Sequence, residues 1–240
     1  MPEAHTVSSY DDDLRFLVRR LSEMGGIAER MVADSVAALV NADTASAQRV
    51  ISEDLLLDAG EREVYDKAVL VIAKRQPMAS DLREIIGSIR IASDLERVGD
   101  LGKNIAKRVI AVHTMAQPRK LVRGLEHLAE LALTQLKEVL DAFATRSPAL
   151  ANSIRERDEE IDAIYTSLFR ELLTYMMEDP RNITACTHLL FCAKNIERIG
   201  DHATNIAETV YYVATGEQLS ADRPKDDETA SMIAPAPGSD

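Results

Sequence analysis

The sequence predicts an all-α protein made of two tandem, pseudo-symmetric three-helix bundles of long antiparallel helices. Aromatic residues are only 4% of the 240 residues and hydrophobic residues are 46%, so the core must consist of Leu, Ala, Val, Ile and Met, a composition that favours helices over strands. Between the prolines, apolar residues recur every three or four positions, the period of one helical face, and no segment shows sustained period-two alternation. The second half of the chain also repeats the first, which indicates two copies of one unit.

The first half of the chain predicts three helices joined by short connections. One apolar stripe runs from Leu14 to Ala38 with no proline in it. Asp43 and Thr44 supply a start signal for a second helix, because short polar side chains cap helix N-termini. Pro77 marks the next joint, since proline breaks a helix interior. The predicted helices cover residues 9–41, 44–75 and 78–113.

The second half predicts three further helices in the same order. Ser147 followed by Pro148 is an N-cap with a first-turn proline, Asp179 and Pro180 end the fifth helix, and Gly216 closes the sixth. Short joints make neighbouring helices antiparallel. The helices are predicted at 118–144, 148–178 and 181–215, the two three-helix units at 8–115 and 116–218, and a flexible tail with three prolines at 219–240.

Charge and composition exclude several classes of protein. The chain has 28 Lys and Arg against 40 Asp and Glu, a net charge of −12, whereas a general nucleic-acid binder needs a basic face. Its two cysteines, Cys186 and Cys192, lack zinc or CxxC spacing and are interpreted as buried thiols of a reducing compartment. The first 13 residues carry no apolar signal segment, and no apolar run is long enough for a membrane span. We therefore expect a cytoplasmic protein.

The repeat is clearest in one acidic segment. Residues 96–106, ERVGDLGKNIA, match residues 197–207, ERIGDHATNIA, at seven of eleven positions. Upstream, Asp54 and Asp58 match Asp158 and Asp162. Each pair of acidic residues is four apart, so both side chains lie on one face of a helix.

These carboxylates are candidate metal ligands. Like charges one turn apart cost a helix about 0.2–0.5 kcal/mol per pair, and pairs on adjacent helices repel further unless a cation neutralises them. An all-oxygen set suits divalent or iron-type ions, with Mg, Mn, Fe, Zn and Ca as candidates. The alternative is that they form solvated acidic faces. The candidate ligands are Asp54, Asp58, Glu96, Asp100, Asp158, Asp162, Glu197 and Asp201.

Other residues in the repeat leave two interpretations open. The mid-helix glycines Gly99 and Gly200 either allow close helix packing or give access to a cluster. His202 has Leu101 as its counterpart, so we do not expect it to be a primary ligand. The chain has no phosphate-binding loop, no nucleophile elbow and no Glu-x-x-His, so no catalytic residue and no enzyme activity are predicted.

The doubled segment Glu-Arg-[Val/Ile]-Gly-Asp-x-x-x-Asn-Ile-Ala resembles the PhoU family of phosphate-transport accessory and regulatory proteins. Residues 75–83, RQPMASDLR, and 200–208, GDHATNIAE, support the resemblance, which covers residues 8–218. It implies two three-helix bundles and assigns the family's metal motif, [Glu/Asp]-x-x-x-Asp, to the same eight carboxylates. One departure is Leu55-Leu56-Leu57, where family members carry a polar residue within the motif.

The resemblance also implies a function. A PhoU-like protein is a negative regulator of phosphate uptake and of the phosphate-starvation response, and it couples a phosphate ABC transporter, through its ATPase subunit, to a phosphate-sensing histidine kinase. It further implies a homodimer. Two alternatives stay open: a metal-dependent phosphate-ester or polyphosphate hydrolase, and a metal-free helical scaffold.

Overall fold

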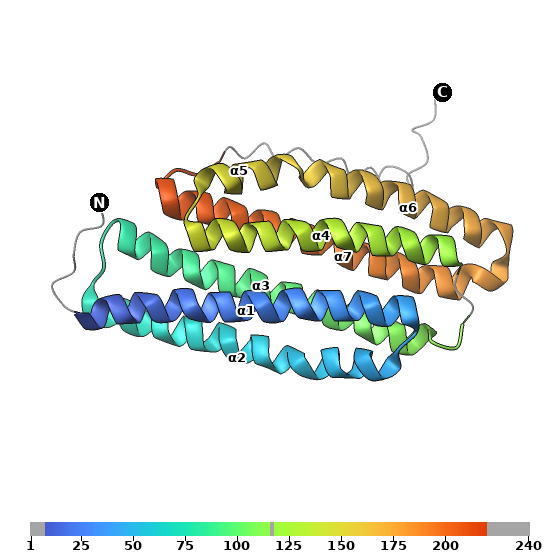
Figure 1. Ribbon diagram of the computed structural model, residues 1–240, viewed down its shortest axis with the longest axis horizontal. Helices are drawn as coiled ribbons and strands as arrows, with labels where there is room; N and C mark the ends of the chain where they lie inside the picture. The colour runs from blue at the N-terminus through green and yellow to red at the C-terminus, as the bar shows by residue number, and fades with distance from the viewer. Residues whose placement is uncertain (1–7, 116–117, 220–240) are drawn as a thin grey trace, which may run out of the picture.

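The computed structural model describes residues 8–115 and 118–219, and every regular element in these ranges is helical, which confirms the predicted all-α class (Figure 1). In chain order the elements are α1 Ser8–Asn41, α2 Thr44–Arg75, α3 Ser80–Val112, α4 Arg119–Thr145, α5 Pro148–Glu156, α6 Asp158–Glu178, the 3-10 turn η1 Pro180–Asn182 and α7 Ile183–Thr215.

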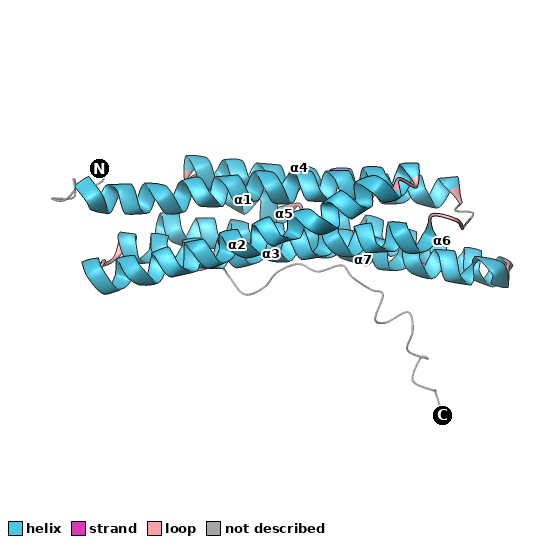
Figure 2. Ribbon diagram, turned by 90° about the horizontal axis from the view of Figure 1, so that it is seen from below, coloured by secondary structure: helices cyan, strands magenta, loops and turns pink. Residues whose placement is uncertain are grey.

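The helices form two bundles that lie alongside each other (Figure 1). Helices α1, α2 and α3 pack together, and α4 and α7 pack with α5 and α6, which jointly take the place of α2. The bundles meet through α3 against α7 and α1 against α4. Figure 2 shows α1 and α4 together on one side of the molecule. The tandem three-helix architecture is therefore present, and the first and third helices of one copy pack against the first and third helices of the other.

The apolar stripes predicted from sequence form the core. Leu17, Leu21 and Met24 of α1 are fully buried, as are Leu121 and Leu128 of α4. Each such side chain contributes about 1.5–3 kcal/mol through burial. The buried apolar residues form one continuous cluster through both bundles.

Capping groups set most helix ends where the sequence predicted them. Asp43 accepts hydrogen bonds from the backbone N–H groups of Ala45 and Ser46, both at 3.0 Å. Ser147 accepts one from Leu150 at 3.3 Å, and Gly216 ends α7 in the left-handed conformation with φ of 81°. These caps confirm three predicted boundaries.

The prediction of one helix over 148–178 is wrong, because the chain breaks at Arg157 between α5 and α6. Arg157 has φ −94° and ψ 0°, and its guanidinium pairs with Glu138 of α4. The break makes Asp158 the first residue of α6, whose first turn is acidic and interacts favourably with the helix dipole.

Several other helix boundaries differ by one or two residues from those predicted, and the predicted tail lies almost entirely outside the described residues. Helix α3 begins at Ser80 instead of 78, and the short turn η1 precedes α7, which begins at Ile183 instead of 181. The predicted tail, 219–240, lies outside the described residues except for Leu219.

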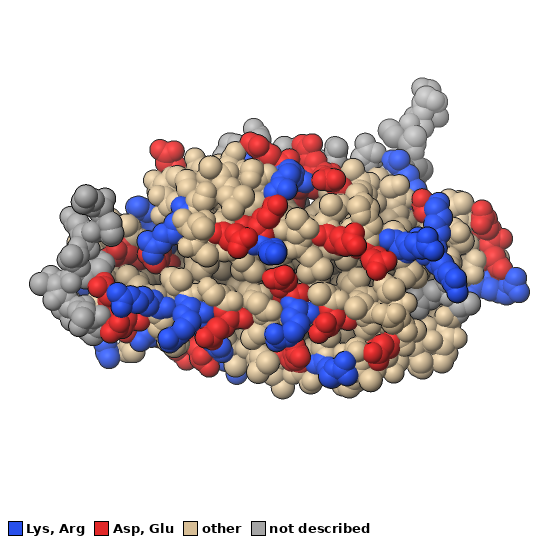
Figure 3. All heavy atoms as spheres, in the orientation of Figure 1, with Lys and Arg blue, Asp and Glu red and all other residues tan. Residues whose placement is uncertain are grey.

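Two further features concern the distribution of surface charge and the apolar character of the helices. The face drawn in Figure 3 has Lys and Arg interspersed with Asp and Glu, so the net charge of −12 is not gathered into one acidic patch on this face. None of the helices in residues 8–115 and 118–219 combines the length and apolar character needed to cross a membrane.

Candidate metal centre

The second bundle holds its four candidate carboxylates on two neighbouring helices. Asp158 and Asp162 lie on α6, and Glu197 and Asp201 lie on α7. Asp158, Asp162 and Glu197 are only 3%, 5% and 4% exposed. Carboxylates are rarely buried to this extent unless they are paired, so these residues are held there by specific contacts.

Glu197 shows that these carboxylates affect one another. Burial raises its pKa to about 7, and the negative charges of Asp201 and Asp162 add to this, while a 2.9 Å hydrogen bond from Lys194 Nζ to Oε1 opposes it. Its other oxygen, Oε2, is buried and accepts no hydrogen bond. The second bundle thus has a buried carboxyl oxygen without a hydrogen bond, in a group whose charged form a bound cation would stabilise.

Asp158 is held by neutral hydrogen-bond donors. Thr204 Oγ1 donates to Asp158 Oδ1 at 2.9 Å, and Gln135 Nε2 lies 2.9 Å from Thr204 Oγ1 and 3.3 Å from Asp158 Oδ1. Gln135 lies on the apolar stripe of α4 and was not among the residues predicted from sequence. A polar residue inside that stripe, where the first repeat has Met31, was the available signal.

The first bundle neutralises its carboxylates with an amine. Lys103 Nζ of α3 lies 2.5 Å from Asp54 Oδ2 on α2 and 2.5 Å from Asp100 Oδ1 on α3. Burial alone would lower the pKa of Lys103, but the hydrogen bonds to Asp100 and Asp54 outweigh it and raise the pKa above its ordinary value. Sequence reasoning missed this lysine, although it stands inside the repeated segment where the second copy has Thr204.

The other two carboxylates of the first bundle lie beside this pair. Burial raises the pKa of Glu96, and the charge of Asp100 and, to a smaller extent, of Asp58 adds to the shift. Arg97 Nε lies 3.4 Å from Glu96 Oε2 and opposes it. All four predicted residues of this bundle are therefore close enough to interact electrostatically.

The two mid-helix glycines have a packing role. A Cβ at Gly99 would overlap Leu57 Cδ1, and a Cβ at Gly200 would lie 2.9 Å from Ile161 Cδ1. Leu57 and Ile161 occupy matching positions of the repeat, within the two carboxylate motifs. Of the two interpretations left open by the sequence, the structure supports close helix approach, which places the motifs of adjacent helices against each other.

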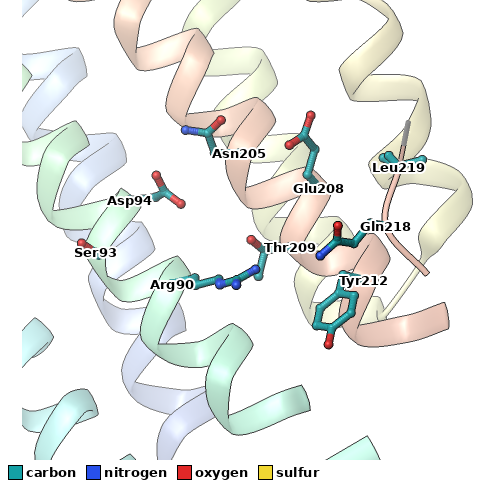
Figure 4. A pocket seen from close by; sticks show the side chains of 9 residues that line it. All are labelled: Arg90, Ser93, Asp94, Asn205, Glu208, Thr209, Tyr212, Gln218 and Leu219. Atoms are coloured by element: carbon teal, nitrogen blue, oxygen red, sulfur yellow. The ribbon is translucent and has the colours of Figure 1, made fainter. Parts of the chain in front are cut away.

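A polar groove between α3 and α7 begins one helical turn beyond Asp201 (Figure 4). Its volume is about 500 Å³, and Arg90 of α3 and Asn205 of α7 are among the residues that line it. His202 Nδ1 lies 2.9 Å from Asp94 Oδ1, so this histidine links the two bundles.

The eight carboxylates supply oxygen atoms that suit a metal ion, but their side chains do not converge on one point in the structure. Within residues 8–115 and 118–219, no three His, Cys, Asp or Glu side chains are positioned to hold one metal ion. Both sets are all-oxygen, which suits a hard cation, and each includes a buried oxygen without a hydrogen bond, Glu96 Oε2 in the first and Glu197 Oε2 in the second. In the first set an ammonium group already lies between Asp54 and Asp100. Metal binding stays a prediction for all eight residues.

Two three-helix bundles that each carry the paired carboxylate motif define a class of tandem helical-bundle proteins. The PhoU domain matches residues 21–109 and 125–210, one stretch in each bundle. The chain therefore belongs to the PhoU family.

Relatives and solved structures agree with this. A Rhizobium meliloti (strain 1021) protein named "Phosphate-specific transport system accessory protein PhoU homolog" is 75% identical over 97% of this chain and 98% of its own length. A relative of the same name from Caulobacter vibrioides (strain NA1000 / CB15N) is 50% identical over 92% of this chain and 96% of its own. The crystal structure of PhoU from Pseudomonas aeruginosa superposes with a TM-score of 0.84 at 38% identity, covering 87% of this chain and 100% of that one.

Proposed function

We propose that this protein is a negative regulator of phosphate uptake and of the phosphate-starvation response. In this role it couples a phosphate ABC transporter, through its ATPase subunit, to a phosphate-sensing histidine kinase, acting in the cytoplasm as a homodimer. The observation that carries the proposal is the match of a PhoU domain to each bundle, together with near-full-length relatives named as phosphate-transport accessory proteins.

We further propose that the protein acts by binding and not by catalysis. Burial raises the pKa of the Cys192 thiol to about 12, and burial also raises that of Cys186, so both cysteines stay protonated and poorly nucleophilic at neutral pH. The relatives' name, phosphate-specific transport system accessory protein, supports the same conclusion.

The metal part of the proposal concerns the second bundle, where Asp158, Asp162, Glu197 and Asp201 would hold a hard divalent or iron-type ion. A bound ion would add positive charge beside these buried carboxylates, to which Lys194 already contributes through Glu197. Side-chain rotamers on α6 and α7 would have to change for three of the oxygens to converge. Support comes from the buried, unbonded Glu197 Oε2 and from the neutral Thr204 at the position of Lys103.

Deletion of the gene tests the regulatory role. We expect phosphate-responsive genes to be expressed in high phosphate in the deletion strain and to be repressed again when the wild-type gene is restored. Continued repression in the deletion strain would overturn the proposal. Co-purification with the transporter ATPase subunit and with the kinase, each tested separately, checks the two partners.

Elemental analysis after dialysis tests the metal. We expect the wild-type protein to retain metal and the variant D158N/D162N/E197Q/D201N to lose it. The matched control E159Q/E160Q removes two exposed carboxylates from the same helical turn and should retain metal. Absence of metal from the wild type would favour the metal-free scaffold. Metal-dependent hydrolysis of a phosphate ester, lost in the quadruple variant, would favour the hydrolase.

A further inference from the structure

Lys103 occupies the centre of the first bundle's carboxylate set. Its Nζ lies 2.5 Å from an oxygen of Asp54 on α2 and 2.5 Å from an oxygen of Asp100 on α3, so one ammonium group bridges the two helices. The Lys103 side chain is 20% exposed and that of Asp54 is 8% exposed. Charge pairs buried to this degree are screened weakly by water and salt.

The second bundle lacks this ammonium group. Thr204 stands at the position of Lys103 and donates a neutral hydrogen bond to Asp158, the counterpart of Asp54. Lys194, whose side chain is 40% exposed, hydrogen-bonds Glu197 of this set at 2.9 Å.

The residues between the two acidic positions of each helix-two motif also differ. Leu55 and Leu56, 69% and 49% exposed, follow Asp54 on α2. The matching positions after Asp158 are Glu159 and Glu160. Inside the motif the first set therefore carries two apolar side chains where the second carries two exposed carboxylates, while Glu61, whose charge acts on Glu96, has Tyr165 as its counterpart in the second copy.

We propose that Lys103 takes the place of the metal ion in the first bundle, so that this bundle is neutralised by the chain itself. A divalent ion that approached Asp54 and Asp100 would have to expel the ammonium group and would then repel it at short range. The tethered amine also has a high effective concentration at the carboxylates, which a dissolved ion at micromolar levels does not match. The inference about Lys103 rests on the proposed function in one respect, which is that it treats the acidic motif as a metal-binding motif.

The test exchanges the lysine and the threonine in the full-length protein, with Mn²⁺ as the probe. The variant K103T is expected to retain at least one more equivalent of Mn²⁺ per chain than the wild type. Without metal, in EDTA, its Tm is expected to fall by roughly 5–10 °C, because Asp54 is left buried without its cation, and Mn²⁺ should restore the loss. The reverse variant T204K should lose Mn²⁺ from the second bundle. Lys107, exposed one turn further along α3, supplies the matched control K107T, which should change neither quantity.

Further variants separate this inference from the metal part of the proposed function. The variant K103T/D54N/D100N removes all three charges and should regain wild-type Tm in EDTA, which keeps the test readable if K103T alone folds poorly. If the wild type holds no Mn²⁺ at all, the metal proposal for the second bundle fails. The Tm loss in K103T and its rescue in the triple variant would then still support the role of Lys103.

Two results would overturn the inference. One is a K103T protein with unchanged Mn²⁺ content and unchanged Tm in EDTA. The other is a wild-type protein that loses Mn²⁺ when D54N/D58N/E96Q/D100N is introduced, since the first bundle would then bind metal with Lys103 present.

Discussion

In the first bundle Asp54 and Asp100 both contact the Lys103 ammonium group, whereas in the second bundle Asp158, the counterpart of Asp54, accepts neutral hydrogen bonds from Gln135 and Thr204. The acidic residues themselves match position for position in the two copies. A repeated acidic motif therefore does not define a site by itself. The residues between and opposite the carboxylates decide whether their charge is neutralised by the chain or left for a cation from solution.

Among the substitutions that test this difference between the bundles, Gln135→Met should have the largest effect on stability. It places in the second bundle the residue type that the first bundle has at the matching position, Met31. The buried Asp158 and Thr204 each lose a hydrogen-bond partner, and we expect the free energy of unfolding to fall by about 2 kcal/mol. Urea denaturation measures it. As a control, Met31→Leu replaces one apolar side chain by another of similar volume at the matching position of the first bundle. It should lower the free energy of unfolding by less than about 1.5 kcal/mol. Equal stability of Gln135→Met and the wild type would mean that the amide network does not stabilise the second set.

Substitution of two glycines on α3 by alanine should change stability by smaller amounts and in opposite directions. Gly99→Ala places a methyl group against the fully buried Leu57 and should destabilise the protein by about 1–2 kcal/mol after the gain in helix propensity. Gly102→Ala meets its nearest atoms at 3.5 Å, an ordinary contact, and the second copy has Ala203 there, so it should stabilise by about 0.5–1 kcal/mol. Thermal unfolding of both variants checks this. If the two glycines behaved alike, packing against Leu57 would not be the reason for Gly99.

A further difference lies where α3 meets α7. The Arg108 guanidinium stands over the Phe191 ring, 4.4 Å from its centroid, whereas the matching positions hold Thr209 and Arg90, which line the groove of Figure 4. Phe191→Leu keeps an apolar side chain but removes the cation–π contact, at a cost of about 0.5–1 kcal/mol. A double-mutant cycle with Arg108→Gln isolates the coupling, and a coupling near zero would contradict the expectation.

The smallest effect concerns pH. Burial and the neighbouring Arg108 lower the pKa of His188, so the unfolded chain binds a proton there more readily than the folded chain does. Stability from this residue is present above its unfolded pKa and is lost as the pH falls through the lowered folded pKa. Between pH 7 and pH 5, the free energy of unfolding should fall slightly more in the wild type than in His188→Gln. Parallel pH profiles would show that His188 does not contribute.

The fold could be predicted from sequence because its determinants are local. Prolines and short polar caps mark the joints, and a stripe such as Leu17, Leu21 and Met24 shows the face that packs inward. The break at Arg157 could not be predicted, because the position holds neither proline nor glycine and its guanidinium bonds Glu138 on another helix. That contact depends on how α4 and α5 pack.

The candidate site was predictable only in part for the same reason. The spacing of each carboxylate pair, such as Glu96 and Asp100, places both on one helical face. Which group lies opposite them depends on the packing of three helices. Lys103 and Gln135 are single residues in otherwise matching repeats, and sequence alone does not show which of the many differences between the repeats face the carboxylates.

The break at Arg157 has a consequence for the rate at which the two sites open. Asp54 lies in the interior of α2, where each turn is hydrogen-bonded to the turns before and after it. Asp158 is instead the first residue of α6. The end of a helix frays at lower free energy than its interior, so amides around residues 157–160 should exchange with deuterium faster than those around 53–56. A ligand that entered or left the second set could do so through this local fluctuation, while the first set would open only when a larger part of its bundle loosens.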